Sequence, residues 1–261
     1  MQTVPNLKSN HFPIIILIGR PGSGKSEIID FLVHIDTEQR LRRYRIAKLD
    51  VLDDFPMLWT WFEEDDILEN EFNKPRLYTD SQGYFKEYYL WDLLIRRLDL
   101  EYQKRMKDNH RNSAKTTTII EFSRGAEHGG YRKALNNFSE EILKNSCILY
   151  VNVSYRESQR KNRLRFNSQR PHSILEHSLP DEKLEKLYSE DDWHEITRSD
   201  SNFLVLDSCR IPFVVFENED DVTSGKVDAL GERLELTLDR LWDVYQKSLD
   251  SLSGKQPGGE A

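Results

Sequence analysis

A run of apolar residues leads directly into a glycine-rich turn, and this pairing limits the fold more than any other feature of the 261-residue sequence. Residues 14–18 read IIILI, and residues 19–26 read GRPGSGKS. The apolar run predicts a buried strand, and the residues after Ser26 have the spacing of an amphipathic helix. Strand, turn and helix in this order match G-x-x-x-x-G-K-[ST], the phosphate-binding loop or P-loop.

Each position of this turn suits a bound triphosphate. Its residues are Gly19, Arg20, Pro21, Gly22, Ser23, Gly24, Lys25 and Ser26. The glycines let successive backbone N–H groups point at phosphate oxygens, Lys25 can reach the outer phosphates, and the Ser26 hydroxyl can ligate Mg²⁺. A helix that begins at about Gly24 aims its positive dipole end at the same phosphates. The sequence therefore predicts an ATP-binding loop rather than a glycine turn without a ligand.

Charge and cysteine content argue against several other classes of protein. Lys and Arg number 37 against 45 Asp and Glu, a net charge of −8 that disfavours a broad nucleic-acid surface. The two cysteines, Cys147 and Cys209, form no disulfide framework and show no metal-ligand spacing. No apolar run is long enough to cross a bilayer, and the N-terminus has no signal-peptide core. We expect a reduced, cytoplasmic protein with no membrane or nucleic-acid partner.

Strand-like and helical patterns alternate along the chain. The strand-like runs are residues 14–18, 44–49, 116–120, 147–153 and 211–216. Helical spacing between them predicts the α/β class, with an approximately five-stranded parallel sheet and helices on both faces. Residues 1–250 then form one domain, in which 55–107 are a helical insertion and 84–106 one long helix. Residues 251–261 are expected to be a disordered tail.

Three carboxylates, Asp50, Asp53 and Asp54, follow the second predicted strand. They are expected at the carboxyl edge of the sheet beside the P-loop, where ligands bind in parallel α/β folds. A carboxylate here can take the proton of a substrate hydroxyl during phosphoryl transfer. Asp53 or Asp54 can equally cap the helix that Pro56 begins. Capping needs only one of the three, so we expect at least one to be functional.

Glu121 closes the third predicted strand, and Arg124 follows three residues later. An acid at this strand end can hold Mg²⁺ through water beside the P-loop. Arg124 can hold an oxygen or phosphate of a substrate. Alternatively, the two side chains form a surface ion pair of little energetic value. Their place after a central strand favours function.

A row of arginines follows the fourth predicted strand. Arg156, Arg160 and Arg163 have the spacing of one helix face, and Arg165 comes two residues later. Guanidinium groups stay charged and stabilise the charge that develops on a transferred phosphoryl group. A solvated helix that pairs with the acidic residues 189–192 is the alternative. In an acidic protein, the row favours a clamp that closes over the triphosphate.

With these features together, the chain resembles the P-loop nucleoside and nucleotide kinase superfamily. The resemblance is strong over residues 14–26, weaker elsewhere and absent over 55–107. It implies the three-layer P-loop NTPase fold, MgATP as phosphoryl donor and a mobile lid at 155–192. It also implies a substrate site between the second and third strands. The lid arginines would be Arg160, Arg163 and Arg165.

The same resemblance implies roles for other residues. Asp53 or Asp50 would be the base, and Glu121 the acid on the magnesium side with Ser26. Arg124 would clamp the substrate. The loop after the last strand would approach the adenine through Asn218.

Two other nucleotide-binding classes compete with a small-molecule kinase. A GTPase would need Asn-Lys-x-Asp late in the chain, whereas residues 47–50 (AKLD) are only partly similar and lie too early. A non-catalytic ATP-binding protein would keep the P-loop, and the sequence leaves this alternative open. The acceptor cannot be named, because residues 55–107 match no known substrate site. Their many aromatic rings could stack on a flat group, and Arg76 or Lys86 could meet an anion.

Overall fold

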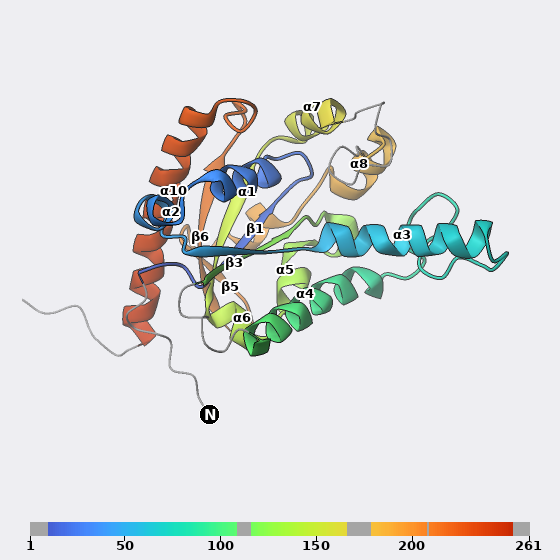
Figure 1. The fold of residues 1–261 in the computed structure, drawn as a ribbon, viewed down its shortest axis with the longest axis horizontal. Coiled ribbons are helices and arrows are strands. Elements are labelled where there is room, and N and C mark those ends of the chain that lie inside the picture. The colour runs from blue at the N-terminus through green and yellow to red at the C-terminus, as the bar shows by residue number, and fades with distance from the viewer. Residues whose placement is uncertain (1–9, 109–115, 166–178, 208, 253–261) are drawn as a thin grey trace, which may run out of the picture.

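Strand β1 (Ile14–Gly19) lies between β3 and β4 in the sheet, and all of its residues are buried. The other strands are β2 (Lys48–Asp53), β3 (Thr116–Phe122), β4 (Ser146–Asn152), β5 (Phe203–Val205) and β6 (Arg210–Glu217). The computed structural model describes residues 10–108, 116–165, 179–207 and 209–252, and its strand order is β2-β3-β1-β4-β6-β5 (Figure 1). All neighbouring pairs are parallel except β5–β6.

Helices cover both faces of this sheet (Figure 1). On one face lie α1 (Lys25–His34), α2 (Thr37–Tyr44) and α10 (Val227–Leu252). On the other lie α4 (Tyr89–Asp108), α5 (Gly130–Asn136), α6 (Glu140–Lys144) and α9 (Trp193–Ile196). Successive residues of a strand point to opposite faces. Ile14, Ile16 and Ile18 therefore pack on the side of α4, α5, α6 and α9, whereas Ile15 and Leu17 pack on the side of α1, α2 and α10. The apolar run of β1 thus contributes side chains to the hydrophobic core on each face of the sheet.

The α/β class, the parallel strands and the helices on both faces are confirmed. One strand was missed: β5 is short and pairs antiparallel at the edge of the sheet. Strand β2 ends at Asp53 rather than near Asp50. Helix α10 continues to Leu252, so the predicted tail is wrong at 251–252, and the rest of it, 253–261, lies outside the described residues.

The prediction of one helix over 84–106 was wrong at its beginning, because α4 starts only at Tyr89. Phe85 instead forms a β-bridge with Thr79. The turn between them is fixed by Asp80, whose carboxylate accepts hydrogen bonds from the backbone N–H groups of Gln82 and Tyr84, both at 2.9 Å. Local side-chain hydrogen bonds therefore outweigh the helical spacing of the apolar residues here.

In the described part of the chain, no helix is long and apolar enough to cross a membrane.

Helix α3 (Asp54–Asn70) begins where β2 ends and runs outward beyond the body of the molecule (Figure 1). The loop after it folds back along the helix because Asp65 holds it there. The fully buried Asp65 carboxylate accepts hydrogen bonds from the backbone N–H groups of Leu77, Tyr78 and Thr79, at 2.5 to 3.2 Å. It also accepts one from the Thr79 hydroxyl at 2.7 Å. One side chain thereby fixes the loop that carries the aromatic residues of the site described below.

We expect Asp65→Ala to release this loop, because the substitution leaves three backbone donors without their acceptor. Each unsatisfied buried donor costs about 1–3 kcal/mol, so the unfolding free energy should fall by about 3 kcal/mol or more. Urea unfolding measures the loss, and hydrogen exchange at residues 77–79 should accelerate. The matched control is Asp66→Ala, whose carboxylate is mostly exposed. Equal effects of the two substitutions would contradict this role for Asp65.

Candidate functional site

The P-loop is held from two sides by segments distant in sequence. Gly22 has φ of 72° and Gly24 φ of 110°, values that only glycine adopts readily. A Cβ on Gly22 would lie 2.9 Å from the Ser158 carbonyl oxygen in α7 (Tyr155–Arg165). A Cβ on Gly24 would lie 2.6 Å from Asn218 Nδ2 in the β6–α10 loop. The glycines are therefore required by the close packing of the loop as well as by its turn.

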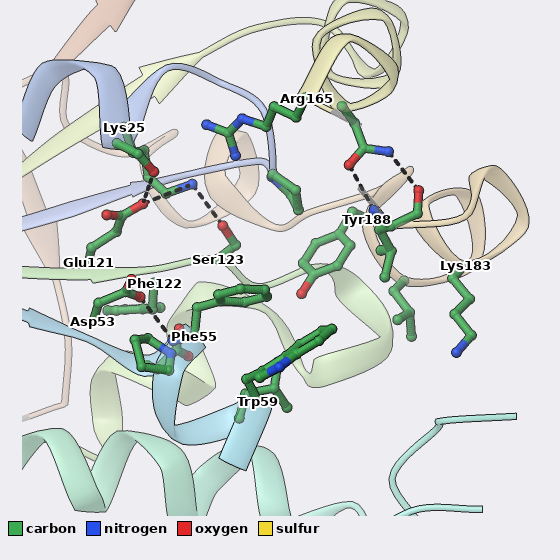
Figure 2. Close-up of a pocket in the computed structure, with 18 of the residues that line it drawn as sticks. Lys25, Asp53, Phe55, Trp59, Glu121, Phe122, Ser123, Arg165, Lys183 and Tyr188 are labelled. Atoms are coloured by element: carbon green, nitrogen blue, oxygen red, sulfur yellow. Dashed lines mark hydrogen bonds and ion pairs between the residues drawn. The ribbon is translucent and has the colours of Figure 1, made fainter. Parts of the chain in front are cut away.

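Lys25 is buried and points back across the mouth of the loop. Its Nζ donates hydrogen bonds to the carbonyl oxygens of Gly19 and Arg20, both at 3.1 Å, and to Ser123 Oγ at 2.9 Å. Glu121 Oε1 lies 3.9 Å away (Figure 2). Burial lowers the pKa of the Lys25 ammonium, and the nearby Glu121 carboxylate opposes this shift. The ammonium is thus held in place, next to the N-terminus of α1.

Two carboxylates face Lys25 and Ser26 from neighbouring strands. Asp53 of β2 is paired in register with Glu121 of β3, and the Ser26 hydroxyl donates to Glu121 Oε1 at 3.5 Å. Burial raises the pKa of Asp53 to about 7, and repulsion from Glu121 and Asp54 adds to this. Burial also raises the pKa of Glu121, although Lys25 opposes the shift. This end of the site is therefore short of positive charge.

Mg²⁺ fits this chemistry. Ser26 and Glu121 supply oxygen ligands that Mg²⁺ prefers, and a cation would relieve the repulsion between the carboxylates that adds to the effect of burial on the pKa of Asp53. Among the described residues, no group of three or more His, Cys, Asp or Glu side chains is arranged to hold a metal by itself. That is consistent with a Mg²⁺ site completed by phosphate oxygens and water, as at other nucleotide sites.

The three candidate bases have different partners. The Asp53 carboxylate caps α3 by accepting the Phe55 N–H at 2.9 Å, so the capping and functional interpretations coincide in one residue. Asp54 is buried and accepts a hydrogen bond from Arg124 Nη1 at 2.7 Å. Asp50 lies inside β2 and accepts one from Arg105 Nη1 at 2.6 Å. Because β2 runs past Asp50, the structure places this residue away from the P-loop and removes it from the candidates.

Arg124 is buried beside the cavity rather than exposed. Besides its ion pair with Asp54, it lies over the rings of Trp91 and Phe122, with its guanidinium carbon 5.3 and 5.4 Å from their centroids. The alternative of a local surface pair with Glu121 is excluded, since its partner is Asp54. A fixed guanidinium that lines a cavity suits the binding of an anion or oxygen.

The arginine row lies on the predicted helix, α7, but Arg160 and Arg163 are on its exposed face rather than on the face that packs inward. The buried face of α7 consists of Glu157, Ser158, Lys161 and Asn162. Arg160 binds Glu157 and Asp221, and Arg163 binds Asp181, both outside the cavity lining. Their carboxylate partners hold Arg160 and Arg163 away from the cavity in this structure, and their assignment to the site stays a prediction.

Arg165 is the arginine of α7 that reaches the P-loop. Its side chain extends toward Lys25 in Figure 2, and its Nη2 donates to both oxygens of Glu27 at 3.2 and 3.1 Å. The helix also contacts the loop directly, because the Ser158 hydroxyl donates to the Pro21 carbonyl oxygen at 2.7 Å. Position 165 lies seven residues after 158, two helical turns along the same face.

Two further predicted ATP-binding residues support the loop from behind. Arg20 donates to the Tyr188 carbonyl oxygen at 3.2 Å and pairs with Asp191 at 2.9 Å. Asn218 is fully buried, and its Nδ2 donates to the Ser23 carbonyl oxygen at 2.7 Å and to Thr223 Oγ1 at 2.9 Å. Neither side chain lines the cavity, so the prediction that Asn218 meets the adenine was wrong.

A cavity of about 1590 Å³ extends from the P-loop along α3. Beyond Asp53 and Glu121 it is lined by aromatic residues, and Figure 2 shows the rings of Phe55, Trp59 and Tyr188 in it. The other aromatic lining residues include Phe62, Tyr84, Phe85, Tyr88 and Trp91. Largely apolar walls with fixed polar groups near one end are typical of a small-molecule site, and the volume exceeds the roughly 300–1,000 Å³ usual for such sites.

Sequence reasoning missed several residues of this cavity. Ser123 accepts a hydrogen bond from Lys25, but nothing in the sequence indicates this role beyond its place two residues after Glu121. Tyr188 comes from α8 (Asp181–Tyr188), and burial raises the pKa of its hydroxyl. His128 comes from the short helix η2 (Ala126–His128), and burial lowers its pKa to about 3, so its ring is neutral. Its Nδ1 accepts the Gly125 N–H at 3.1 Å. No local pattern indicates the last two, because tertiary packing alone places them.

Comparison with solved structures finds similar folds. The chain is similar to Kti12 of Chaetomium thermophilum in complex with ADP-AlF3, with 15% identity and a TM-score of 0.48, over 89% of this chain and 98% of that one. A sugar kinase from Janibacter sp. shows 14% identity and a TM-score of 0.37 over 89% and 98% of the two chains. Shikimate kinase from Acinetobacter baumannii, in complex with shikimate, shows 16% and 0.40 over 88% and 94%.

No protein-family model matches the chain, and no curated protein matches it. Function must therefore be inferred from the residues of the site.

The acidic end of the site predicts a pH-dependent stability. Asp53 has a pKa of about 7 in the folded protein and an ordinary value of 3.8, so the folded form keeps its proton to higher pH than the unfolded chain. Stability therefore falls as the pH rises from about 4 to about 7. Asp53→Asn retains the cap and removes this loss. In Mg²⁺-free buffer, we expect the variant to be more stable than wild type at pH 8 by on the order of 3 kcal/mol.

Urea unfolding at pH 8 and pH 4 measures this difference, which should vanish at the lower pH. Asp50→Asn is the control and should show no such gain, because Arg105 pairs with that carboxylate. A stabilisation by Asp53→Asn that is the same at both pH values would contradict the assignment.

Proposed function

We propose that this protein is an ATP-dependent phosphotransferase that transfers the γ-phosphoryl group of MgATP to a hydroxyl of a small molecule. The observation that carries this proposal is the in-register pair Asp53–Glu121 facing Lys25 and Ser26 at the mouth of a large aromatic cavity. A site built only to hold nucleotide would not need the cavity or a second, protonatable carboxylate.

In the proposed reaction, the acceptor oxygen attacks the γ-phosphorus while the bond to the β-phosphate oxygen breaks, and ADP leaves. The proton of the acceptor hydroxyl passes to Asp53. A base with a pKa near the working pH is the most effective for this transfer, and burial raises the pKa of Asp53 toward that range, to about 7 in the Mg²⁺-free site.

The cations around the cavity would stabilise the charge on the transferred group. Lys25 would turn from the carbonyl oxygens of Gly19 and Arg20 to the outer phosphates, and Arg165 would leave Glu27 for the same purpose. Arg124, fixed by Asp54, would position the acceptor. Mg²⁺, held through Ser26 and Glu121, would neutralise part of the phosphate charge.

Lys25→Met should remove ATP turnover while the protein stays folded. The substitution keeps a long apolar stem but removes the charge that meets the phosphates, so we expect a loss of at least about 100-fold. ADP formation in the presence of a mixture of alcohols, sugars and nucleosides measures activity, and circular dichroism checks the fold. Lys144→Met is the control, since Lys144 is an exposed lysine that pairs with Glu140 and does not line the cavity. Near-normal turnover in Lys25→Met, or a strong preference for GTP, would overturn the proposal.

Asp53→Asn should lower kcat by about 10²- to 10⁴-fold and leave the KM for ATP nearly unchanged, because the base acts on the acceptor proton. Steady-state kinetics with any acceptor found in the mixture make the comparison. Asp50→Asn should behave like wild type, as its carboxylate pairs with Arg105 instead. If Asp53→Asn were fully active and Asp54→Asn were not, the base would be Asp54.

A further inference from the structure

Two lysines of α8 lie at the cavity without a counter-ion. Within the described residues, Lys183 and Lys186 have no carboxylate at ion-pair distance and donate no hydrogen bond, yet both line the cavity. Their ammonium groups share one contact, the ring of Tyr84, at 5.1 and 4.2 Å from its centroid. Two like charges therefore converge on a single neutral ring.

The other cations that line the cavity are already bound. Arg76 pairs with Asp66 and Glu69, and the remaining pairs are Lys25–Glu121, Arg124–Asp54 and Arg165–Glu27. Lys86 donates to the Arg76 carbonyl oxygen, and Lys226 to that of Asp220 at 3.0 Å. The sequence had indicated Arg76 and Lys86 for an anion, but both are committed within the protein. The lysines of α8 are not.

The loop opposite α8 is shaped to admit one of these ammonium groups. Gly83 has φ of 73°, and a Cβ there would lie 2.8 Å from Lys183 Nζ. Oδ1 of the neighbouring Asp80 accepts the N–H groups of Gln82 and Tyr84, and this carboxylate makes no ion pair with Lys183. Burial lowers the pKa of Lys183, and the Asp80 charge only partly opposes the shift. A partly desolvated ammonium without a counter-ion is stabilised by an anion that enters the cavity.

The cavity therefore has the Asp53–Glu121 pair at one end, the two lysines of α8 at the other and aromatic rings between them; Glu63, Asp66 and Glu127 also line it. Figure 2 shows Asp53 and Glu121 at one end and Lys183 on the opposite side, with the rings of Trp59 and Tyr188 between. The acidic end repels an anionic group, whereas the end at α8 attracts it. A molecule that fits this distribution has its hydroxyl near Asp53, a flat apolar body and an anionic group beyond it.

We propose that the phosphoryl acceptor carries an anionic oxygen group, a phosphate ester or a carboxylate, that binds Lys183 and Lys186 at the α8 end of the cavity. That the bound molecule is a phosphoryl acceptor rests on the proposed function, but the anion site itself can be tested without turnover. Lys183 and Lys186 then select the substrate: they hold the far end of the molecule and leave its hydroxyl at Asp53.

The test uses three aromatic probes of one size: 1-naphthyl phosphate, 1-naphthoate and neutral 1-naphthol. Isothermal titration calorimetry measures their binding to the full chain with the P-loop saturated by an unreactive ATP analogue and Mg²⁺, which keeps the phosphate probe off the P-loop. We expect the anionic probes to bind more tightly than naphthol. The double variant Lys183→Ala/Lys186→Ala should weaken the anions at least 10-fold and change naphthol less than 2-fold, roughly the effect of losing charge-assisted hydrogen bonds.

Lys183→Arg/Lys186→Arg retains the charge and should keep the preference for anions, whereas Lys144→Ala should change nothing. Tighter binding of the phosphate than of the carboxylate would identify a phosphorylated acceptor, and the reverse a carboxylic acid. Equal weakening of all three probes, or none, in the alanine variant would overturn the inference. Failure of the ATP analogue to bind would instead refute the proposed function, so the two failures are distinguishable.

Discussion

The placement of Lys25 against Glu121 is the interaction on which the site depends. Lys25 is buried, so its charge depends on the carbonyl oxygens of the loop, Ser123 and Glu121 around it. Glu121 is there because β3 pairs in register with β1, and the same register sets Asp53 beside it from β2. Strands β2 and β3 and the start of α1, which follows β1, thus bring one cation and two carboxylates together, and burial together with the excess of negative charge raises the pKa of Asp53.

Support for the P-loop comes from side chains that never meet the ligand cavity. Asn218 holds the Ser23 carbonyl oxygen, and the buried Lys161 of α7 binds Asp221 and Thr223, each of which belongs to the β6–α10 loop. These buried hydrogen bonds hold the loop and α7 together. Polar residues near a P-loop are therefore of two kinds. Some face the phosphate site, and others hold in place the loop backbone that faces it.

Much of the fold could be predicted from the sequence because its signals are local and strong. An apolar run followed by the P-loop fixed a strand, a turn and a helix, and the alternation beyond it predicted a parallel sheet. The site could be predicted only in part. Strand ends indicated Asp53, Glu121 and Arg124, which all line the cavity, but helical spacing could not tell which face of α7 packs inward, so Arg160 was chosen. That choice depends on partners such as Asp221, sixty-one residues away along the chain.

The acceptor side was beyond sequence reasoning for a different physical reason. Lys183 and Tyr84 are distant in sequence, and their contact exists because Asp65 folds the loop after α3 back toward the cavity. A lysine on a polar helix such as α8 normally indicates solvent, and only its position over an aromatic ring, with no carboxylate at ion-pair distance among the described residues, makes it informative. Charge is thus distributed along the cavity by tertiary structure: carboxylates come from strand ends and free ammonium groups from a helix that packs across from them. A substrate must match that order of groups to bring its hydroxyl to Asp53.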